Sequence, residues 1–488
     1  MERDILDSGI SAFRIAFLAL PAMALLALPA NPAFADEPPE RPVGAAALTG
    51  TPMSRDPPGV PCTCTEECVA NQGWGNVCED KVCKPYRDRW SLLDMIGAAN
   101  APNPPPFKLM PAVFPAIGFS PAAGALIGVD GTLGMFLGDP KDTTISNLQG
   151  VFLLTSKAQV ILQISSTVMT ARNDWELQGD WRFLIFNQDT FGLGTGPTPV
   201  GSGFTLSGWG TTAAVPGGQP MDFNMIRFNQ TVYRRAWKEL YAGAGVRIDR
   251  YFAVQDQQLD LGATPPVVTS NYAYSIYNGF DPNQYTTSGV ALSTLWDSRD
   301  STINPYRGIY ALLDFTAYPT WLGSSRSAAV MQAEFRAYVG MNPSIPRNVL
   351  AFWAYFRGVT GGVLPYLALP ATGWDSRNRT GRGYIQGRFR GLQEAYAEAE
   401  WRFRLTDNGF LGGVLFANAQ SFSAQAVNTS GPGWTFTYAG QKLLEYVQPG
   451  GGFGLRFMMN SESRTNVTLD FGFGNNYFGV WLNAGEYF

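Results

Sequence analysis

From about Met110 onward, apolar and polar residues alternate with a period of two in short segments that are separated by turn residues. In Glu394–Leu405 (EAYAEAEWRFRL), the odd positions hold Ala, Trp, Phe and Leu, and the even positions hold Glu, Tyr and Arg. The same alternation recurs in Met331–Val339 and in Val467–Phe473. A period of two is typical of a β-strand with one apolar and one polar face, whereas a helical stripe needs a period of 3.6.

These segments predict an all-β fold, a 16-stranded antiparallel transmembrane β-barrel over residues 110–488 with an inward-folded long loop. Strands that cross an outer membrane need roughly 9–11 residues, apolar outward and polar or small inward. A soluble all-β protein is the alternative. We expect strands at residues 110–119, 122–137, 144–156, 158–171, 174–187, 222–237, 239–253, 286–298, 308–319, 325–341, 348–361, 393–405, 410–421, 448–459, 464–474 and 477–488.

The lengths of the connections favour the membrane barrel. All connections after even-numbered strands are short, and the long ones follow odd-numbered strands. Outer-membrane barrels have short periplasmic turns and long outer loops, whereas a soluble sandwich has no reason to sort its loops in this way. The four long connections are residues 188–221, 254–285, 362–392 and 422–447.

Composition narrows the class of protein further. The 488 residues include 13% aromatics and 54 glycines but only 15% charged residues, which suits a wall between lipid and a lumen. The net charge of −4 does not indicate a nucleic-acid partner. The chain has no histidine, which excludes Ser-His-Asp hydrolysis and H-E-x-x-H zinc sites. We therefore expect no enzymatic activity, no cofactor and no metal site.

The N-terminal region predicts export. An apolar run, Ile15–Ala30, precedes an A-x-A arrangement at Ala33 and Ala35, so we expect residues 1–35 to be a signal peptide. A single membrane helix is the alternative, but the run is short for a bilayer and contains two prolines. Residues 36–109 are rich in Pro and Cys and are predicted to be a periplasmic linker. Export together with strand alternation predicts a location in the cell outer membrane.

The five cysteines lie close together in that linker. An oxidising compartment makes disulfides the expected state, with three possible connectivities for four cysteines and one cysteine left over. Zinc binding by four thiolates is the alternative. The terminal aromatic Phe488 follows a strand-like segment, and we expect it to act as an assembly signal for the outer-membrane assembly machinery. The disulfide candidates are Cys62, Cys64, Cys68, Cys78 and Cys83.

Two motifs resemble the bacterial surface antigen family, the outer-membrane assembly barrels that include BamA and TamA. The first is a D-x-R-D then P-x-x-G pattern at a predicted periplasmic turn, in Trp296–Gly308 (WDSRDSTINPYRG). Its proline and glycine suit a turn, and its acids and arginine suit mutual charge pairing. An ordinary salt-bridged turn is the alternative. The matching residues are Asp297, Arg299, Asp300, Pro305 and Gly308.

The second motif lies in the third long loop, in Gly381–Gly391 (GRGYIQGRFRG). The family carries R-G-[FY] there, often followed by G-x-[FY]-R, and its loop folds into the lumen. By this resemblance Arg382 should meet an acid of the inner wall, and Glu398 and Glu400 face the lumen in our register. A Gly/Arg-rich surface loop is the alternative. The matching residues are Arg382, Gly383, Tyr384, Gly387, Phe389 and Arg390.

The resemblance implies a barrel that assists protein insertion or translocation, or lipid movement, at the outer membrane. Its expected partners are outer-membrane lipid and client proteins or lipids. Family members are thought to use a weak seam between the first and last strands, where Pro115, Pro121, Gly472 and Gly474 would thin the hydrogen-bond ladder. Residues 36–109 contain no amphipathic helix, so we expect no POTRA domain. A passive porin-like channel and a structural or anchoring barrel are the alternatives.

Overall fold

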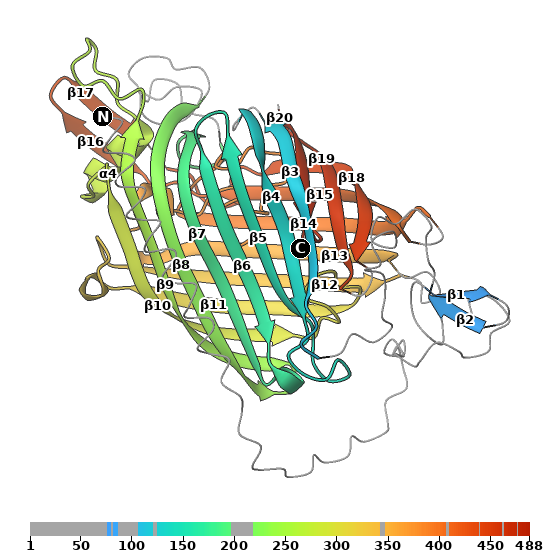
Figure 1. The fold of residues 1–488 in the computed structure, drawn as a ribbon. Helices are drawn as coiled ribbons and strands as arrows, with labels where there is room; N and C mark the ends of the chain where they lie inside the picture. The colour runs from blue at the N-terminus through green and yellow to red at the C-terminus, as the bar shows by residue number, and fades with distance from the viewer. Residues whose placement is uncertain are drawn as a thin grey trace. The chain divides into compact units, whose positions relative to one another are not determined.

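In a computed structural model, the sixteen predicted strands form one antiparallel sheet that curls into a nearly closed barrel (Figure 1). Each strand pairs with its neighbour in the chain, apart from one hairpin inserted between β15 and β18. The predicted signal peptide and Cys62, Cys64 and Cys68 lie outside the described residues. The structure describes residues 76–79, 82–85, 106–120, 124–196, 218–341, 347–406, 409–438, 440–460, 463–475 and 477–488.

The predicted strand boundaries agree with the structure to within three residues, except at the end of the last strand. That strand was expected to reach residue 488 and instead ends at Ala484. The barrel strands are β3 (Met110–Ser120), β4 (Gly124–Met135), β5 (Ser146–Thr155), β6 (Val160–Met169), β7 (Trp175–Thr190), β8 (Gln219–Trp237), β9 (Leu240–Asp256), β10 (Tyr285–Asp297), β11 (Gly308–Tyr318), β12 (Ala328–Gly340), β13 (Val349–Gly362), β14 (Gln393–Arg404), β15 (Leu411–Phe422), β18 (Gln448–Asn460), β19 (Thr465–Gly474) and β20 (Tyr477–Ala484).

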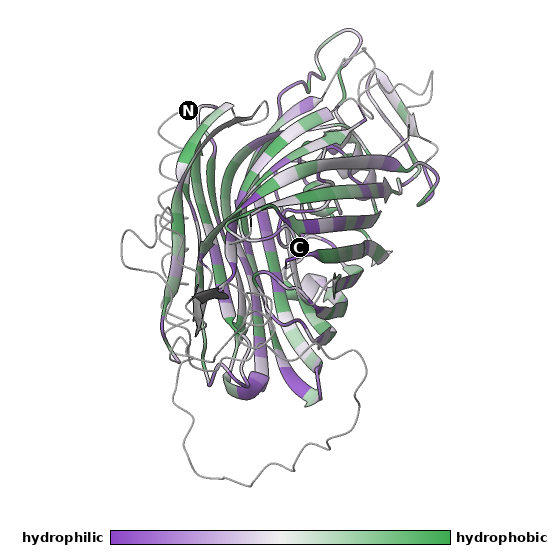
Figure 2. Cartoon of the chain, turned by 90° about the vertical axis from the view of Figure 1, so that its right-hand side faces the viewer, coloured by the Kyte–Doolittle hydropathy of each residue, from purple (hydrophilic) through white to green (hydrophobic). Residues whose placement is uncertain are grey.

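Alternation along the strands separates the two faces of the wall. On β14, Glu400 and Arg402 are 2% and 4% exposed, whereas Trp401 between them is 41% exposed. The charged face therefore points into the lumen and the apolar face points outward. Figure 2 shows hydrophilic and hydrophobic residues alternating along the strands. The wall is thus apolar on its outer surface and polar on its inner surface, the opposite of a soluble protein.

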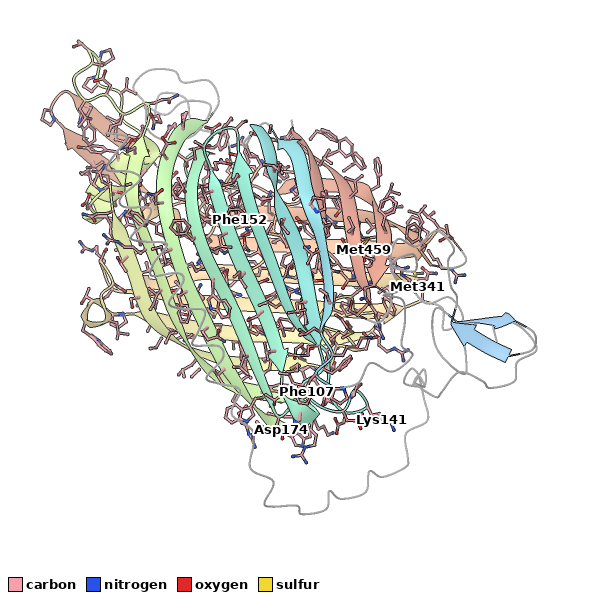
Figure 3. All side chains as sticks on the ribbon, in the orientation of Figure 1. Phe107, Lys141, Phe152, Asp174, Met341 and Met459 are labelled. Atoms are coloured by element: carbon pink, nitrogen blue, oxygen red, sulfur yellow. The ribbon has the colours of Figure 1, made fainter. Side chains whose placement is uncertain are left out.

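An apolar belt covers the outside of the barrel. Phe152 of β5 is labelled on the wall in Figure 3, while Lys141 and Asp174 lie at one end of the wall. Contiguous apolar exposure of this extent is what a lipid-facing surface presents. The belt is formed by Ile127, Val129, Phe152, Leu154, Phe228, Val232, Val246, Ile248, Val290, Leu292, Leu313, Phe315, Phe335, Phe352, Trp401, Leu415, Phe453, Phe473, Val480 and Leu482.

The two ends of the barrel differ, and we call them the loop end and the turn end. The four long connections leave from the loop end, where a buried apolar cluster includes Tyr274, Tyr366 and Trp434 (Figure 1). Within the described ranges, none of the helices combines the length and the apolar character that crossing a bilayer requires. The additional elements are α4 (Ser270–Asn278), β16 (Val427–Gly431), β17 (Trp434–Tyr438), and the 3-10 turns η2 (Ala171–Asn173), η3 (Thr320–Leu322) and η4 (Tyr366–Ala368).

The predicted linker contains a small hairpin, β1 (Asn76–Glu79) and β2 (Val82–Pro85). Its register places Cys78 opposite Cys83. Opposed residues of antiparallel strands have Cα atoms about 4.5–5.5 Å apart, a separation that a disulfide spans. The backbone therefore brings together two of the five disulfide candidates.

Candidate functional site: the lumen loop and the barrel seam

Arg382 is the centre of a buried ion network inside the barrel. It lies in the loop between β13 and β14 and contacts both Glu398 and Glu400, the two acids expected from the sequence. It also donates a hydrogen bond of 2.9 Å to Asp470 of β19. The side chain of Arg382 is fully buried, and its guanidinium carbon lies 3.4 Å from the ring centre of Phe416. One arginine thus joins the loop to two separate parts of the wall.

The network extends beyond the residues that the sequence pointed to. Arg402 donates to Glu400 at 2.7 Å, and Arg456 donates to Asp470 at 2.6 Å and to Glu486 at 2.7 Å. Burial alone would raise the pKa of Glu486, but the neighbouring Arg456 and Arg402 outweigh it and lower that pKa. The alternation of lipid-facing and lumen-facing residues along β18 and β19 would have placed Arg456 and Asp470 in the lumen.

Gly383 and Tyr384 press the loop against the last strands of the sheet. Gly383 has a φ of +109°, and a Cβ atom on it would lie 2.8 Å from the carbonyl oxygen of Phe473. The Tyr384 hydroxyl donates to the Pro449 carbonyl at 2.6 Å and accepts from the Asn475 amide at 2.9 Å. The arginine, glycine and aromatic residues of this motif therefore all contact β18, β19 or the turn that follows.

Two glycines of the last strands make room for this contact. A Cβ atom on Gly472 would lie 3.0 Å from Gly383, and one on Gly474 would lie 2.6 Å from the Tyr384 ring. Both glycines are paired in register with β18, so the thinning expected from the sequence is not seen between these strands. Pro115 lies in β3, which pairs with β4 through its whole length, and Pro121 is outside the described residues.

The second half of the motif holds the loop at a different place. Arg390 donates to the carbonyl oxygens of Tyr366 at 3.1 Å and Leu367 at 2.9 Å, and so supplies donors to buried carbonyls of η4. Phe389 stacks on Phe422 with ring centres 6.3 Å apart. The Gly387 amide donates to the loop backbone at 2.8 Å. These residues fix the internal shape of the loop rather than its ionic anchor.

The loop also reaches the opposite wall. Arg182 of β7 donates to the carbonyl oxygen of Asp375 at 2.7 Å and contacts the Asn378 side chain. The Asn378 amide donates to Gln163 of β6 at 2.6 Å. The loop therefore crosses the lumen from β6 and β7 to β14 and β19. The space beside it is a polar cavity of about 120 Å³, lined by residues that include Gln149, Asp180, Arg227, Arg336 and Arg377.

The turn motif lies at the turn end, between β10 and β11. Arg299 donates to both oxygens of Asp297, at 2.9 and 2.6 Å. Asp300 accepts from the Tyr306 amide at 2.9 Å and from Arg464 at 2.6 Å, which links this turn to the base of β19. Pro305 is buried within the same turn. Charge pairs and hydrogen bonds therefore hold the turn together, with Asp297 and Arg299 buried and Asp300 exposed.

Gly308 closes this turn in a conformation that other residues rarely adopt. Its φ is +109°, and an added Cβ atom would lie 2.3 Å from the Ser298 carbonyl oxygen. We expect Gly308→Ala to destabilise the barrel by about 2 kcal/mol or more, from backbone strain plus this clash. Urea unfolding in detergent micelles measures the loss. Gly323→Ala is the matched control, because Gly323 has a φ of +98° but no atom within 4 Å of an added Cβ; equal losses would contradict the role of the clash.

Phe488 lies inside the barrel, because the last strand ends four residues earlier than predicted, at Ala484. The role of Phe488 as an assembly signal stays a prediction. Phe488 is not part of β20; it is 2% exposed and packs against Trp353 of β13 with ring centres 5.3 Å apart. Gly485, with a φ of +82°, follows β20 and starts the inward course. The sequence expectation failed because alternation continues past the strand, and it does not reveal where pairing stops.

The seam of the barrel lies between β3 and β20. These are the two ends of the strand order, and within the described residues each is hydrogen-bonded to one neighbouring strand only. Thr132 of β4 and Thr465 of β19 have their hydroxyl oxygens 3.5 Å apart near the turn end. Side chains thus approach each other across a junction that lacks a continuous backbone ladder. The fold and this interior define a transmembrane β-barrel with an inserted loop and an incompletely paired seam.

Comparisons with known proteins give only distant similarity. No family model and no curated protein matches the chain. Among solved structures it is similar to BamA from Haemophilus ducreyi lacking POTRA domains 1–3, at 12% identity and a TM-score of 0.42, covering 78% of this chain and 70% of that one. It is similar to CdiB from Acinetobacter baumannii, at 12% identity and a TM-score of 0.40, covering 76% of this chain and 56% of that one. OccK10 from Pseudomonas aeruginosa has 10% identity and a TM-score of 0.26. These values assign no family, and the barrel architecture rests on the strand order of this chain.

Proposed function

We propose that this chain is an outer-membrane barrel, without enzymatic activity, that assists insertion or translocation of proteins, or movement of lipid, through its seam. The observation that carries the proposal is that, in the part of the chain that the structure describes, β3 and β20 each keep one strand edge without a strand partner. Unpaired edge groups are costly in lipid and are a template for another strand. The proposed partners are outer-membrane lipid, client proteins or lipids, and the assembly machinery during biogenesis.

The lumen loop supports this proposal because it is anchored beside the seam. Arg382 binds Asp470 of β19, and Tyr384 binds Pro449 of β18. A displacement of the loop would therefore remove support from the strands next to the opening. In the proposed function, the loop holds these strands in place until a client strand or a lipid occupies the seam.

A disulfide across the seam tests this function. We expect Thr132→Cys combined with Thr465→Cys, with the five native cysteines changed to serine, to form a bridge, because the two side chains already meet. Cells that carry only this variant should show the outer-membrane protein and lipid profile of a deletion strain. Adding a reductant should restore the normal profile, because the barrel itself is otherwise unchanged.

The control bridge joins two strands away from the seam. Asn147 and Thr167 lie opposite each other on the paired strands β5 and β6, so cysteines there cross-link strands that have no need to separate. This variant should complement the deletion fully. Full complementation by a completely oxidised Thr132→Cys/Thr465→Cys variant would exclude seam opening as the mechanism.

A passive channel is disfavoured by the filled lumen. The loop crosses the interior from β6 and β7 to β19, and its residues Arg379, Arg382 and Arg390 are at most 5% exposed. We therefore expect the wild-type protein to show low conductance in planar bilayers. Removal of residues 371–389 should raise the conductance by at least about tenfold, as an emptied barrel of this strand number leaves an aqueous channel. A large, steady conductance in the wild-type protein would instead support the porin-like alternative.

A further inference from the structure

The last five residues follow a course that the barrel wall does not require. We call Ala484–Phe488 the strap. After β20 the chain turns at Gly485, whose amide donates to the Asn466 carbonyl at 2.8 Å, and then runs along the inner face of the sheet. Ala484, Glu486, Tyr487 and Phe488 are each at most 6% exposed. Ala484 still pairs with Val467 of β19, and the residues after it are held by specific contacts.

The first contacts of the strap reach across the seam. The Ala484 amide donates to Oδ2 of Asp130 on β4 at 3.2 Å, and the Ala484 carbonyl accepts from Nε2 of Gln149 on β5 at 2.9 Å. Both side chains belong to the first strands of the barrel, whereas Ala484 ends the last strand. Two side chains therefore bind the backbone of the last strand at a place where a backbone ladder would do so in a closed barrel.

The remaining contacts fasten the strap to the loop and to the far wall. Arg379 of the lumen loop donates to the carbonyl oxygens of Glu486 at 2.8 Å and Tyr487 at 3.1 Å. The Glu486 carboxylate binds Arg456, and Phe488 packs on Trp353. The strap thus touches three groups at once: the first strands, the loop and the wall opposite.

We propose that the strap is an internal latch that holds the turn end of the seam closed, and that the lumen loop controls it through Arg379. Side-chain contacts to one backbone segment separate more easily than a strand ladder, because only a few hydrogen bonds must break together. When the loop moves, Arg379 leaves the Glu486 and Tyr487 carbonyls without donors and weakens the hold of the strap. The consequence for clients rests on the proposed function, but the latch itself is a property of this chain.

The test measures seam closure directly, without any transport assay. Its readout is the rate at which a limiting oxidant forms the bridge between cysteines at positions 132 and 465 in purified, detergent-solubilised protein. We expect Asp130→Ala with Gln149→Ala to slow this rate by about tenfold, since each lost hydrogen bond weakens the closed state by roughly two- to tenfold. Asn147→Ala is the control for the wall, because Asn147 lies two residues from Gln149 on β5 and its side-chain oxygen has no hydrogen-bond partner.

A second pair of variants tests control by the loop. Arg379→Ala should slow the bridge several-fold, because Arg379 donates to the Glu486 and Tyr487 carbonyls. Arg377→Ala in the same loop should not, because Arg377 lines the polar cavity and, among the described residues, the strap accepts its loop hydrogen bonds from Arg379. Removal of residues 486–488 should also slow the bridge, which keeps the test decisive if the wall variants fold poorly. Unchanged rates in folded Asp130→Ala/Gln149→Ala and truncated proteins would overturn the latch. Because no client is involved, that result would leave the proposed function standing, and loss of the proposed function would leave the latch standing.

Discussion

Arg382→Ala is expected to cause the largest loss of stability of any single substitution in the lumen. The change leaves Glu398, Glu400 and Asp470 without the guanidinium that contacts all three. Removing one partner from a buried ion pair costs about 3–5 kcal/mol, because the remaining charges stay desolvated. We expect a fall of this size in the free energy of unfolding, measured by urea titration in micelles, together with proteolytic cleavage in the released loop.

Two control variants separate the network from a general effect of losing an arginine. Arg172→Ala removes an exposed guanidinium, whose side chain is 72% exposed and 3.6 Å from Asp174, and should change stability by less than about 1 kcal/mol. Arg382→Lys keeps the charge but loses the planar fork, so it should recover only part of the loss. If Arg382→Ala were as stable as Arg172→Ala, the network would not anchor the loop.

The strands were predictable because the wall obeys one rule over its full length. Each residue either faces lipid or faces the lumen, so a period of two appears in segments as different as Glu394–Leu405 and Val467–Phe473. The elements of the long connections escaped prediction for the opposite reason. α4 has nine residues, which is shorter than the window that a helical period needs, and the β16–β17 hairpin follows no membrane-spanning pattern.

The contact between Arg382 and two acids of β14 was accessible to sequence reasoning for two reasons. The alternation along the strand placed Glu398 and Glu400 on the lumen side. The motif placed Arg382 in the loop that precedes them. The contacts of Asp470 and Glu486 with this network were missed because they depend on how the wall curves and on where the last strand ends. Asp470 lies on β19, the third strand along from β14 in the sheet, and Glu486 enters the lumen only because β20 ends at Ala484.

The composition of the network helps to explain why the loop is held by charges. Three arginines, Arg382, Arg402 and Arg456, face four acids that come from β14, β19 and the strap. An apolar core of similar volume is often more stable than a buried ion network. A charged network, however, specifies one seating of the loop, because any shift leaves a carboxylate unpaired. A loop that supports the seam from inside the barrel must be held in one position, and the ion network provides this.

Gly383→Val is the second substitution with a large expected effect. It tests whether the lumen loop must pack against β19, and it changes no charge. With a φ of +109°, Gly383 occupies a backbone conformation that a β-branched residue avoids, at a cost of about 1–3 kcal/mol. An added Cβ would also lie 2.8 Å from the Phe473 oxygen, which is backbone and cannot rotate away. The loop must therefore lift off β19 and carry Arg382 out of reach of Asp470. We expect a loss of stability close to that of Arg382→Ala.

A double-mutant cycle decides whether these two losses have one cause. If Gly383→Val acts by unseating Arg382, then adding Arg382→Ala to it should cost much less than Arg382→Ala costs alone, because residues of one network are not additive. Gly323→Val, at a φ of +98° with open space around it, measures the strain alone. Additive losses in the double variant would mean that the backbone contact with β19 and the ion network hold the loop independently, and the loop would then be expected to stay partly seated when either is removed.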